Sequence, residues 1–340
     1  MKPSRDQASS VRDTTIYSLA TELGLSPSTV SRAFSRPDLV RAGVRDRILA
    51  LAEERGYAPS RVARSLATGR TGLFGLLVGD ITNPFFPPLV RAVEHATNVL
   101  DSAVLLVDAR SGGRAEHELV RRVAQHVDGM ILASPRARTA DLRAALGRTP
   151  AVLINRAISG VPSVTCHARD AHREAADHLA GLGHRRIALM RGPSESWVAQ
   201  RRTDALRRWA SARSADGVEL VELPPMQSSY ALARTEAENI VATGATAVIA
   251  IDDYCAAGFI AGAEQLGIEV PADISVVGCD GVLFGEVMRP QLTTVLVPGP
   301  ELGRAAVSLL NQVLAGQEVK NLTMTGKLRI GGTTGPARRS

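Results

Sequence analysis

From Gly72 onward, short apolar runs alternate with helical patterns, and this alternation restricts the possible folds more than any other feature. The first series of runs is "GLFGLLV", "AVLLVD", "DGMILAS" and "AVLIN", and the second is "RIALM", "VELVEL", "TAVIAI" and "ISVVGC". Amphipathic helices are predicted near residues 89–100, 115–126, 139–146, 171–182, 200–211, 231–241 and 256–266. Strand and helix repeated in this way predict parallel sheets covered on both faces. Two series predict two doubly wound lobes.

The N-terminal part has a different pattern, which predicts three short helices over residues 14–56. Apolar residues recur at helical spacing in "TTIYSLATELG" and in "VRDRILALAEERGY", and each segment ends at a glycine. Between them, Ser26 is a good N-cap and Pro27 suits the first helical position. Three compact helices with a tight second turn indicate a helix-turn-helix unit. The basic segment "APSRVARSLATGRTG" then predicts a linker with one short helix, about residues 60–67.

The positive charge is concentrated in this N-terminal part. The chain has a formal net charge of +6, and residues 1–70 contain twelve Lys and Arg against seven Asp and Glu, a difference of +5. Either a solvated basic surface or a polyanion partner would account for it. The helix that begins at Ser26 favours the second interpretation, because it would turn Val30, Ala33 and Phe34 inward. Its outward arc would then carry Pro27, Ser28, Ser31, Arg32 and Ser35.

Short hydroxyl side chains let a helix backbone approach a groove wall, and arginine reaches phosphate or a guanine edge. "TTIYSLATELGLSPSTVSRAF" followed by "VRDRILALAEERGYAPSRVARSL" resembles the head and hinge of the lactose-repressor (LacI/GalR) family of bacterial transcription regulators. The resemblance implies that Thr15 and Tyr17 contact phosphate or groove wall. It implies groove-facing positions at Pro27, Ser28 and Arg32, with support from Ser26, Thr29 and Ser31. Pro27 has no side-chain donor or acceptor, so direct readout would rest on Ser28 and Arg32.

The same resemblance implies that "RVARSL" forms a hinge helix on double-stranded operator DNA. Its contact residues would be Arg61, Ala63, Arg64 and Leu66, with Leu66 inserted into the minor groove at the centre of the site. Such a wedge unstacks one base step and bends the duplex, which widens the contact.

A second candidate site follows the first strand of the body, in "DITNPFF". Ligands of open α/β folds bind at the carboxyl ends of strands. Asn83 offers a donor and an acceptor, and the rings of Phe85 and Phe86 suit the apolar side of a sugar or base, although two such rings are locally more typical of a core.

The chain as far as about Gly332 resembles the periplasmic-binding-protein-like core of the same family, with "GHRRIAL", "AIDDYCAAG", "VPADISVVGCDG" and "LTTV" in order. The resemblance implies an effector cleft between the lobes. Its ligand positions would be Asn83, Phe85, Phe86, Asn155, Arg156, Arg202, Asp253 and Asp280. This set suits a polyhydroxylated ring. A pentose-like sugar is the first expectation and a purine or nucleoside the second. Asp253 could instead cap a helix. Cys166 and His167 stand where the family usually has an acid, and their role stays open.

The predicted fold is therefore an N-terminal all-α helix-turn-helix domain followed by an α/β core of two doubly wound parallel-sheet lobes. The expected domains are 1–58, a hinge and linker at 59–71, a core at 72–333 and a tail at 334–340. Within the core, the first lobe would take about 72–163 and 296–318, and the second about 164–295 and 319–333. We expect a cytoplasmic, non-membrane homodimer, since no signal-peptide pattern, long apolar run or terminal leucine heptad is present.

No cofactor or metal is expected, because the three cysteines form no C-x-x-C pair. Catalysis is not expected either, since no catalytic motif is present. A solute-binding protein of a transporter would share the body but not the basic head.

Overall fold

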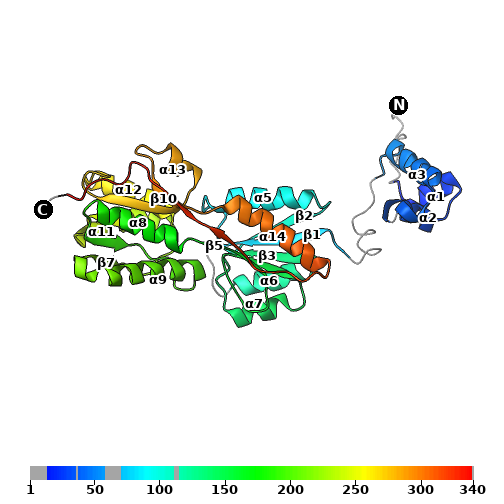
Figure 1. The fold of residues 1–340 in the computed structure, drawn as a ribbon. Helices are drawn as coiled ribbons and strands as arrows, with labels where there is room; N and C mark the ends of the chain where they lie inside the picture. Colours follow the sequence, from blue (N-terminus) through cyan, green and yellow to red (C-terminus); the bar gives the residue numbers. More distant parts are fainter. Residues whose placement is uncertain (1–13, 36, 58–69, 111–114, 339–340) are drawn as a thin grey trace, which may run out of the picture. The chain divides into compact units, whose positions relative to one another are not determined.

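The computed structural model describes residues 14–35, 37–57, 70–110 and 115–338, and it divides into two compact units, Met1–Gly72 and Leu73–Ser340 (Figure 1). The predicted contact residues Arg61, Ala63, Arg64 and Leu66 lie outside the described residues.

The N-terminal unit has the three predicted helices, α1 (Ile16–Leu23), α2 (Pro27–Ser35) and α3 (Ala42–Glu54), with a short 3₁₀ turn η1 (Pro37–Leu39) between the last two. Helix α1 is held by a capping box between Thr15 and Ser18 and ends at Gly24, whose φ of 67° lies in the left-handed region. The helices share a small core that confirms the predicted inward faces. It contains Leu19, Ala20, Val30, Ala33, Ile48 and Ala52.

The first lobe of the larger unit is a six-stranded sheet in the order β11-β5-β4-β3-β1-β2, and all five of its strand pairs are parallel. Helices α5 and α14 cover one face, and α6 and α7 cover the other (Figure 1). The strands are β1 (Leu73–Val78), β2 (Ala103–Asp108), β3 (Gly129–Ala133), β4 (Ala151–Ile154), β5 (Ser163–His167) and β11 (Leu322–Thr325). The helices are α5 (Phe86–Asn98), α6 (Glu116–Ala124), α7 (Thr139–Leu146) and α14 (Gly299–Leu314).

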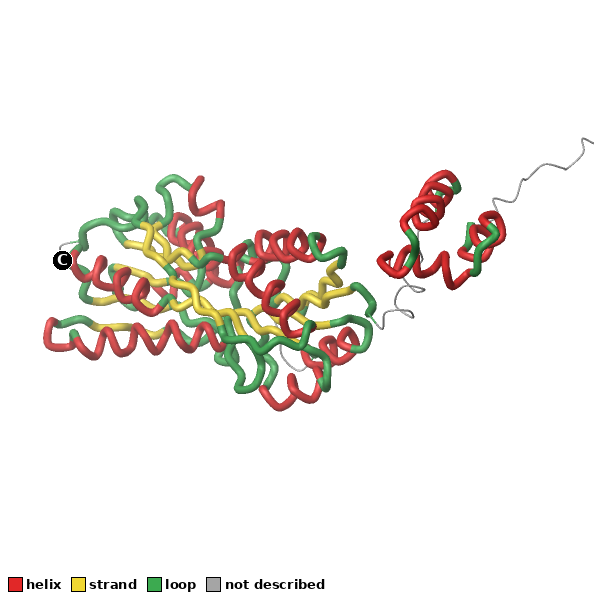
Figure 2. The backbone as a smooth tube through the Cα atoms, turned by 45° about the vertical axis from the view of Figure 1, so that its right-hand side comes forward, coloured by secondary structure: helices red, strands yellow, loops and turns green. Residues whose placement is uncertain are grey.

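The second lobe repeats this plan with the order β12-β10-β9-β8-β6-β7, in which only the edge strand β12 is antiparallel. Figure 2 shows both lobes as strands between helical layers. The strands are β6 (Arg186–Leu189), β7 (Glu219–Glu222), β8 (Ala247–Ile249), β9 (Ser275–Asp280), β10 (Thr293–Leu296) and β12 (Lys327–Arg329). The helices are α8 (Arg169–Gly181), α9 (Trp197–Ala212), the 3₁₀ turn η2 (Ser214–Asp216), α10 (Tyr230–Thr235), α11 (Ala237–Ala242), α12 (Asp253–Gln265) and α13 (Leu283–Val287).

The chain passes between the lobes three times, after β5, after β10 and after β11. Strand β5 pairs with β4, and β11 pairs with β5, so residues 164–167 and 322–325 belong to the first sheet. The expected assignment of both segments to the second lobe is therefore wrong. They are short, partly exposed strands, β11 at the sheet edge and β5 next to it, and they lack the apolar run that identifies a buried strand.

The C-terminal residues as far as 338 pack on the second lobe. The backbone amide of Ala337 donates to the carbonyl of Leu182 at 2.9 Å, and Arg338 pairs with Asp273 at 2.8 Å. The carbonyl of Gly335 meets the buried His184 ring at 3.0 Å. The segment expected as a tail is thus part of the lobe over residues 334–338.

Candidate functional site

The outer face of α2 gathers polar side chains on the surface of the N-terminal unit. Ser26, Pro27, Ser28 and Arg32 are exposed, and Thr29 and Ser31 are partly exposed. The hydroxyl of Ser26 accepts from the amide of Thr29 at 3.2 Å and contacts the hydroxyls of Ser28 and Thr29. This cluster helps to fix the start of α2, because both the carbonyl and the hydroxyl of Ser26 accept from the amide of Thr29 in the first turn.

Two residues at the start of α1 extend this polar surface. Thr15 is exposed, and Tyr17 is 73% exposed, which is unusual for so large a ring. Helix α3 is tied to α1 by an ion pair between Arg55 and Glu22. The described residues of the predicted contact set are thus all at least partly exposed on a rigid three-helix unit, as contact with a large ligand requires.

A cleft of about 540 Å³ lies between the two lobes of the larger unit and is open to solvent. Six of the eight predicted ligand residues line it. They are Asn83, Phe85, Phe86, Asn155, Arg202 and Asp280. Other lining residues are Ser134, Arg136, Ser196, Ser228 and Asp252. Most of them stand at or just beyond the carboxyl ends of parallel strands, where the fold places ligands.

Backbone strain coincides with this cleft. Ser134, Asn155 and Asp280 follow or end β3, β4 and β9, and their φ angles are 54°, 54° and 114°. Non-glycine residues seldom adopt positive φ, and such outliers cluster at functional sites. Backbone hydrogen bonds between strands stabilise this conformation, because the amide of Asn155 donates to the carbonyl of Val164 at 2.9 Å.

An ion pair forms the second-lobe wall of the cleft. Arg202 donates to Asp280 at 2.9 Å and to the carbonyl of Ile251 at 2.6 Å. Burial raises the pKa of Asp280 to about 6, although Arg202 opposes the rise and Asp252 adds to it. Burial alone would lower the pKa of Arg202, but Cys279 and Asp280 beside it raise that pKa overall. The guanidinium therefore stays charged, and its Nε is buried with no partner among the described residues.

The phenylalanines serve both the core and the cleft. Phe86 is 7% exposed and belongs to the main core cluster, while Phe85 is partly buried beside Gly299. Their ring centroids are 5.4 Å apart in an edge-to-face arrangement. The side-chain oxygen of Asn83 accepts from the amide of Phe85 at 3.0 Å, which fixes the turn that presents both rings.

Asp253 does not line the cleft, so the expectation for this residue is corrected. Its side chain is fully buried and accepts hydrogen bonds from the amides of Gly281 and Val282 and the hydroxyl of Thr294. The carboxyl group that reaches the cleft is that of Asp252, which caps α12 by accepting from the amide of Cys255 at 2.8 Å. The helix cap is therefore the first aspartate of the pair, and the second holds the loop after β9.

Arg156 does not line the cleft either. Its guanidinium is buried and donates to the carbonyls of Pro135 and Ala137, both at 2.7 Å, and to the hydroxyl of Thr139. Glu116 holds the same loop from the other side, accepting from the amides of Arg136 and Ala137. Arg156 therefore supports the loop that presents Arg136 to the cleft.

Hydrogen bonds between described residues join the lobes across the cleft. The Asn83 amide donates to Ser228 at 3.0 Å and to Asp252 at 3.5 Å, and Arg136 donates to Gln227 at 2.6 Å. Sequence reasoning missed Ser134, Arg136, Ser228 and Asp252. Position after an apolar run could have identified the first two, whereas Ser228 lies in an irregular segment without a pattern.

Other chemistry has little support in the described part of the chain. No group of three His, Cys, Asp or Glu side chains there could hold a metal ion. Cys255 and Cys279 are buried free thiols, whereas the free thiol of Cys166 is only partly buried. In the same ranges, no helix combines the length and the apolar character that crossing a membrane requires.

Two family models match the chain in the order of its two units. Residues 15–60 match the model described as bacterial regulatory proteins, lacI family, and residues 176–334 match a periplasmic binding protein-like domain. The ribose operon repressor of Halalkalibacterium halodurans is 30% identical over 302 residues, which cover 87% of this chain and 89% of that protein.

Solved structures resemble the chain in fold as well. The lac repressor dimer bound to operator and the anti-inducer ONPF has a TM-score of 0.83 at 28% identity and covers 95% of this chain and 100% of its own. A LacI family transcriptional regulator from Enterococcus faecium with bound ribose has a TM-score of 0.69 at 28% identity and covers 78% and 100%.

A helix-turn-helix unit joined to a two-lobed core with a polar cleft defines a DNA-binding transcriptional regulator and not an enzyme. Its similarity runs through both units. The chain belongs to the lacI family of bacterial regulatory proteins.

Proposed function

We propose that the protein is a repressor whose homodimer binds a pseudo-palindromic operator, and that a sugar in the inter-lobe cleft controls its operator affinity. The observation that carries the proposal is the combination of an exposed polar face on α2 with a cleft lined by amide, guanidinium, carboxylate and aromatic groups. A bacterial regulator that acts on operator DNA works in the cytoplasm.

A pentose-like sugar is the effector that the cleft favours. The amide of Asn83, the guanidinium of Arg202 and the carboxylates of Asp252 and Asp280 supply the paired donors and acceptors that ring hydroxyls need. The ring of Phe85 offers an apolar face. Relatives that are named for ribose or hold ribose support the same choice. A purine or nucleoside is the alternative, because the aromatic faces would also stack on a base.

On the DNA side, the proposed groove-facing residues are Pro27, Ser28 and Arg32, with Thr15, Tyr17, Ser26, Thr29 and Ser31 on phosphate or groove wall. Arg32 would reach a guanine edge, because its guanidinium can donate two parallel hydrogen bonds. The hinge residues Arg61, Ala63, Arg64 and Leu66 belong to the same proposal on the basis of the family resemblance.

The test begins with a thermal-shift screen of the full chain against pentoses, hexoses, nucleosides and purines. A ligand that binds only the folded state raises the melting temperature by mass action. The selected compound is then added to an operator-binding assay on sequences enriched from a random DNA pool. We expect a pentose to shift the melting temperature and to change operator affinity.

The operator assay includes the variant Arg32→Ala. If Arg32 contacts a guanine, its loss should weaken binding by about 1 to 3 kcal/mol and relax preference at one operator position. Unchanged base preference at every position would contradict the readout role. A ligand that shifts the melting temperature but leaves operator affinity unchanged would contradict the regulatory role of the cleft.

A further inference from the structure

A second pocket lies beside the effector cleft where β5 leads into α8 and α9 begins, and it encloses about 690 Å³ when its opening to solvent is included. Its walls come from the β5–α8 connection, the first three turns of α9 and Val297. The lining residues are Asn155, Cys166, His167, Ala168, Arg169, His172, Trp197, Val198, Arg201, Arg202, Asp204, Arg208 and Val297. Asn155, Val198 and Arg202 also line the effector cleft, so the two spaces are neighbours that share one wall.

The pocket is strongly basic. Four arginines line it against one carboxylate, that of Asp204. Arg202 is neutralised by Asp280, and Asp204 contacts Arg207, which lies outside the lining. For Arg169, Arg201 and Arg208, the described residues provide no salt bridge. Three uncompensated guanidinium groups around one hollow create a positive potential that attracts an anion.

The geometry of these arginines is partly fixed before any ligand binds. The guanidinium carbon of Arg201 lies 4.4 Å from the centroid of the Trp197 ring, so cation–π contact restrains the side chain. Arg201, Asp204 and Arg208 lie at helical spacings of three and four residues on α9, which places them on one face. An arginine fork suits a tetrahedral phosphate, since it can donate two hydrogen bonds to adjacent oxygens.

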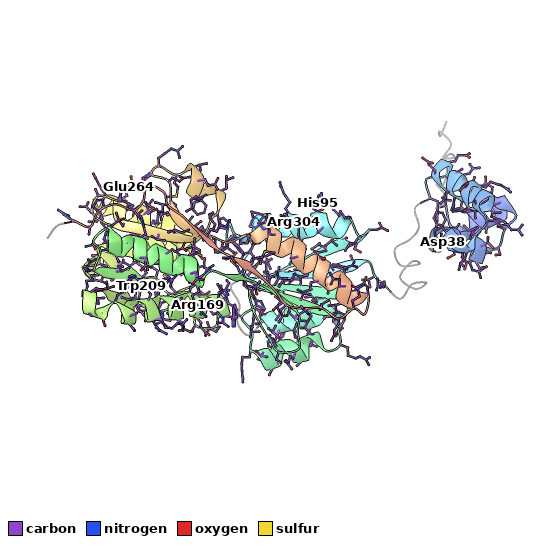
Figure 3. The ribbon with its side chains drawn as sticks, in the orientation of Figure 1. Asp38, His95, Arg169, Trp209, Glu264 and Arg304 are labelled. Carbon is purple, nitrogen blue, oxygen red and sulfur yellow. The ribbon has the colours of Figure 1, made fainter. Side chains whose placement is uncertain are left out.

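The N-terminus of α8 also forms part of the pocket wall. The helix has 13 residues, and its N-cap residue Ala168 supplies no side-chain hydrogen bond to the first turn. The amides there carry the positive end of the helix dipole. His167, Ala168 and Arg169 all line the pocket, and Figure 3 labels Arg169 at the end of α8 beside the first lobe. Asp170 lies on this first turn but does not line the pocket.

We propose that this pocket binds the phosphate group of a phosphorylated small molecule whose uncharged part reaches the effector cleft. The inference rests on the proposed function and specifies the chemical class of the effector as a phosphate monoester. Arg169, Arg201 and Arg208 hold the phosphate oxygens, and Asn155 and Arg202 lie where the two spaces meet.

Isothermal titration of the full chain tests the assignment. The probes are ribose, glucose and fructose, the esters ribose 5-phosphate, glucose 6-phosphate and fructose 1-phosphate, and inorganic phosphate. We expect at least one ester to bind about tenfold or more tightly than both its parent sugar and inorganic phosphate, since charge-assisted hydrogen bonds are the stronger ones.

The variants Arg169→Gln and Arg208→Gln should each weaken ester binding about five- to tenfold and leave the melting temperature of the free protein unchanged, because both side chains are exposed. Arg148→Gln is the matched control, since Arg148 is exposed on the first lobe and lies outside both lining sets. It should bind the ester as the unchanged chain does.

Equal affinity for ester and parent sugar overturns the phosphate assignment and leaves the proposed function intact. Equal affinity for ester and inorganic phosphate also overturns it, because the pocket would then hold the free anion. If Arg169→Gln and Arg208→Gln leave the ester affinity unchanged, the phosphate binds elsewhere and the assignment is wrong. If none of the seven probes binds, the inference is also overturned. Operator binding without ligand, measured in parallel, distinguishes these outcomes from failure of the DNA-binding proposal.

Discussion

At the scale of single residues, His172 makes the stability of the core depend on pH. It lies on α8 with its side chain buried, and its Nδ1 lies 2.7 Å from the carbonyl of Ala168. The pKa of His172 is lowered to about 3, chiefly by burial and also by the charge of Arg202, while the contact with Ala168 opposes the shift. The unfolded chain binds the proton near its ordinary pKa of about 6.5, so acid favours the unfolded state throughout the window from about 6.5 to 3.

Between pH 7 and pH 5, this one group should reduce the free energy of unfolding by about 2 kcal/mol. The check is urea unfolding at both pH values. In His172→Asn, whose amide can donate to the same carbonyl, the difference between the two pH values should shrink by about that amount. His95→Asn is the control, because His95 is exposed on α5 (Figure 3). A pH difference in His172→Asn equal to that of the unchanged chain would contradict the prediction.

Sequence reasoning located single residues well where a motif fixes their position relative to a strand end. Asn83, Asn155, Arg202 and Asp280 all line the cleft. The prediction was wrong at the adjacent pair Asp252 and Asp253, because either aspartate can cap a helix. Neighbouring side chains on a helix point about 100° apart, so choosing the wrong one of the pair places the carboxylate on a different face. The choice depends on the amides of the β9 loop, which are distant in sequence.

At the scale of elements, Gly258 and Gly262 let α12 pack directly on α10. A Cβ added at Gly262 would meet the carbonyl oxygen of Arg234 at 2.3 Å and the Cβ of Ala237 at 2.6 Å. The change Gly262→Ala should therefore destabilise the second lobe by roughly 1 to 3 kcal/mol, since overpacking outweighs the gain of about 1 kcal/mol in helix propensity.

Gly181→Ala is the matched control in α8 of the same lobe, because a Cβ there meets nothing within 4 Å. It should raise stability by up to about 1 kcal/mol. Thermal or urea unfolding of the two variants checks the pair. A Gly262→Ala variant as stable as Gly181→Ala would mean that α10 moves away from α12 without cost.

Most elements with a strong apolar pattern were predicted, but α14 was not, although its apolar residues Leu302, Val307 and Leu310 are buried. The eight apolar runs all became strands, although β2 and β7 are partly exposed, whereas β5, β10, β11 and β12 were missed. Strands β11 and β12 lie at sheet edges, and none of their residues is fully buried, so tertiary pairing forms them rather than local hydrophobicity. The helix expected over 231–241 is two helices, α10 and α11, separated at Glu236. Alanine and glutamate favour helix on both sides of the break, so the sequence alone does not indicate it.

At the scale of the whole molecule, an effector can regulate the operator only if it binds two lobe arrangements with different affinity. The hydrogen bonds of Asn83 with Ser228 and Asp252 already join the lobes. A ligand that binds beside these residues therefore affects the contact between the lobes. The change Asp252→Asn tests this link, because asparagine keeps the helix cap and the shape but removes the charge.

Asp252→Asn should weaken effector binding about tenfold, which corresponds to about 1.4 kcal/mol, because a ring hydroxyl then loses a charged acceptor. The effector concentration that gives half the change in operator affinity should rise by the same factor, since occupancy of the cleft drives that change. Operator affinity without effector should not change. The control is Glu264→Gln, exposed near the other end of α12. If Asp252→Asn instead weakened operator binding in the absence of effector, the bond from Asn83 would be part of the DNA-binding arrangement, and the cleft would control the operator through lobe contact before any ligand arrives.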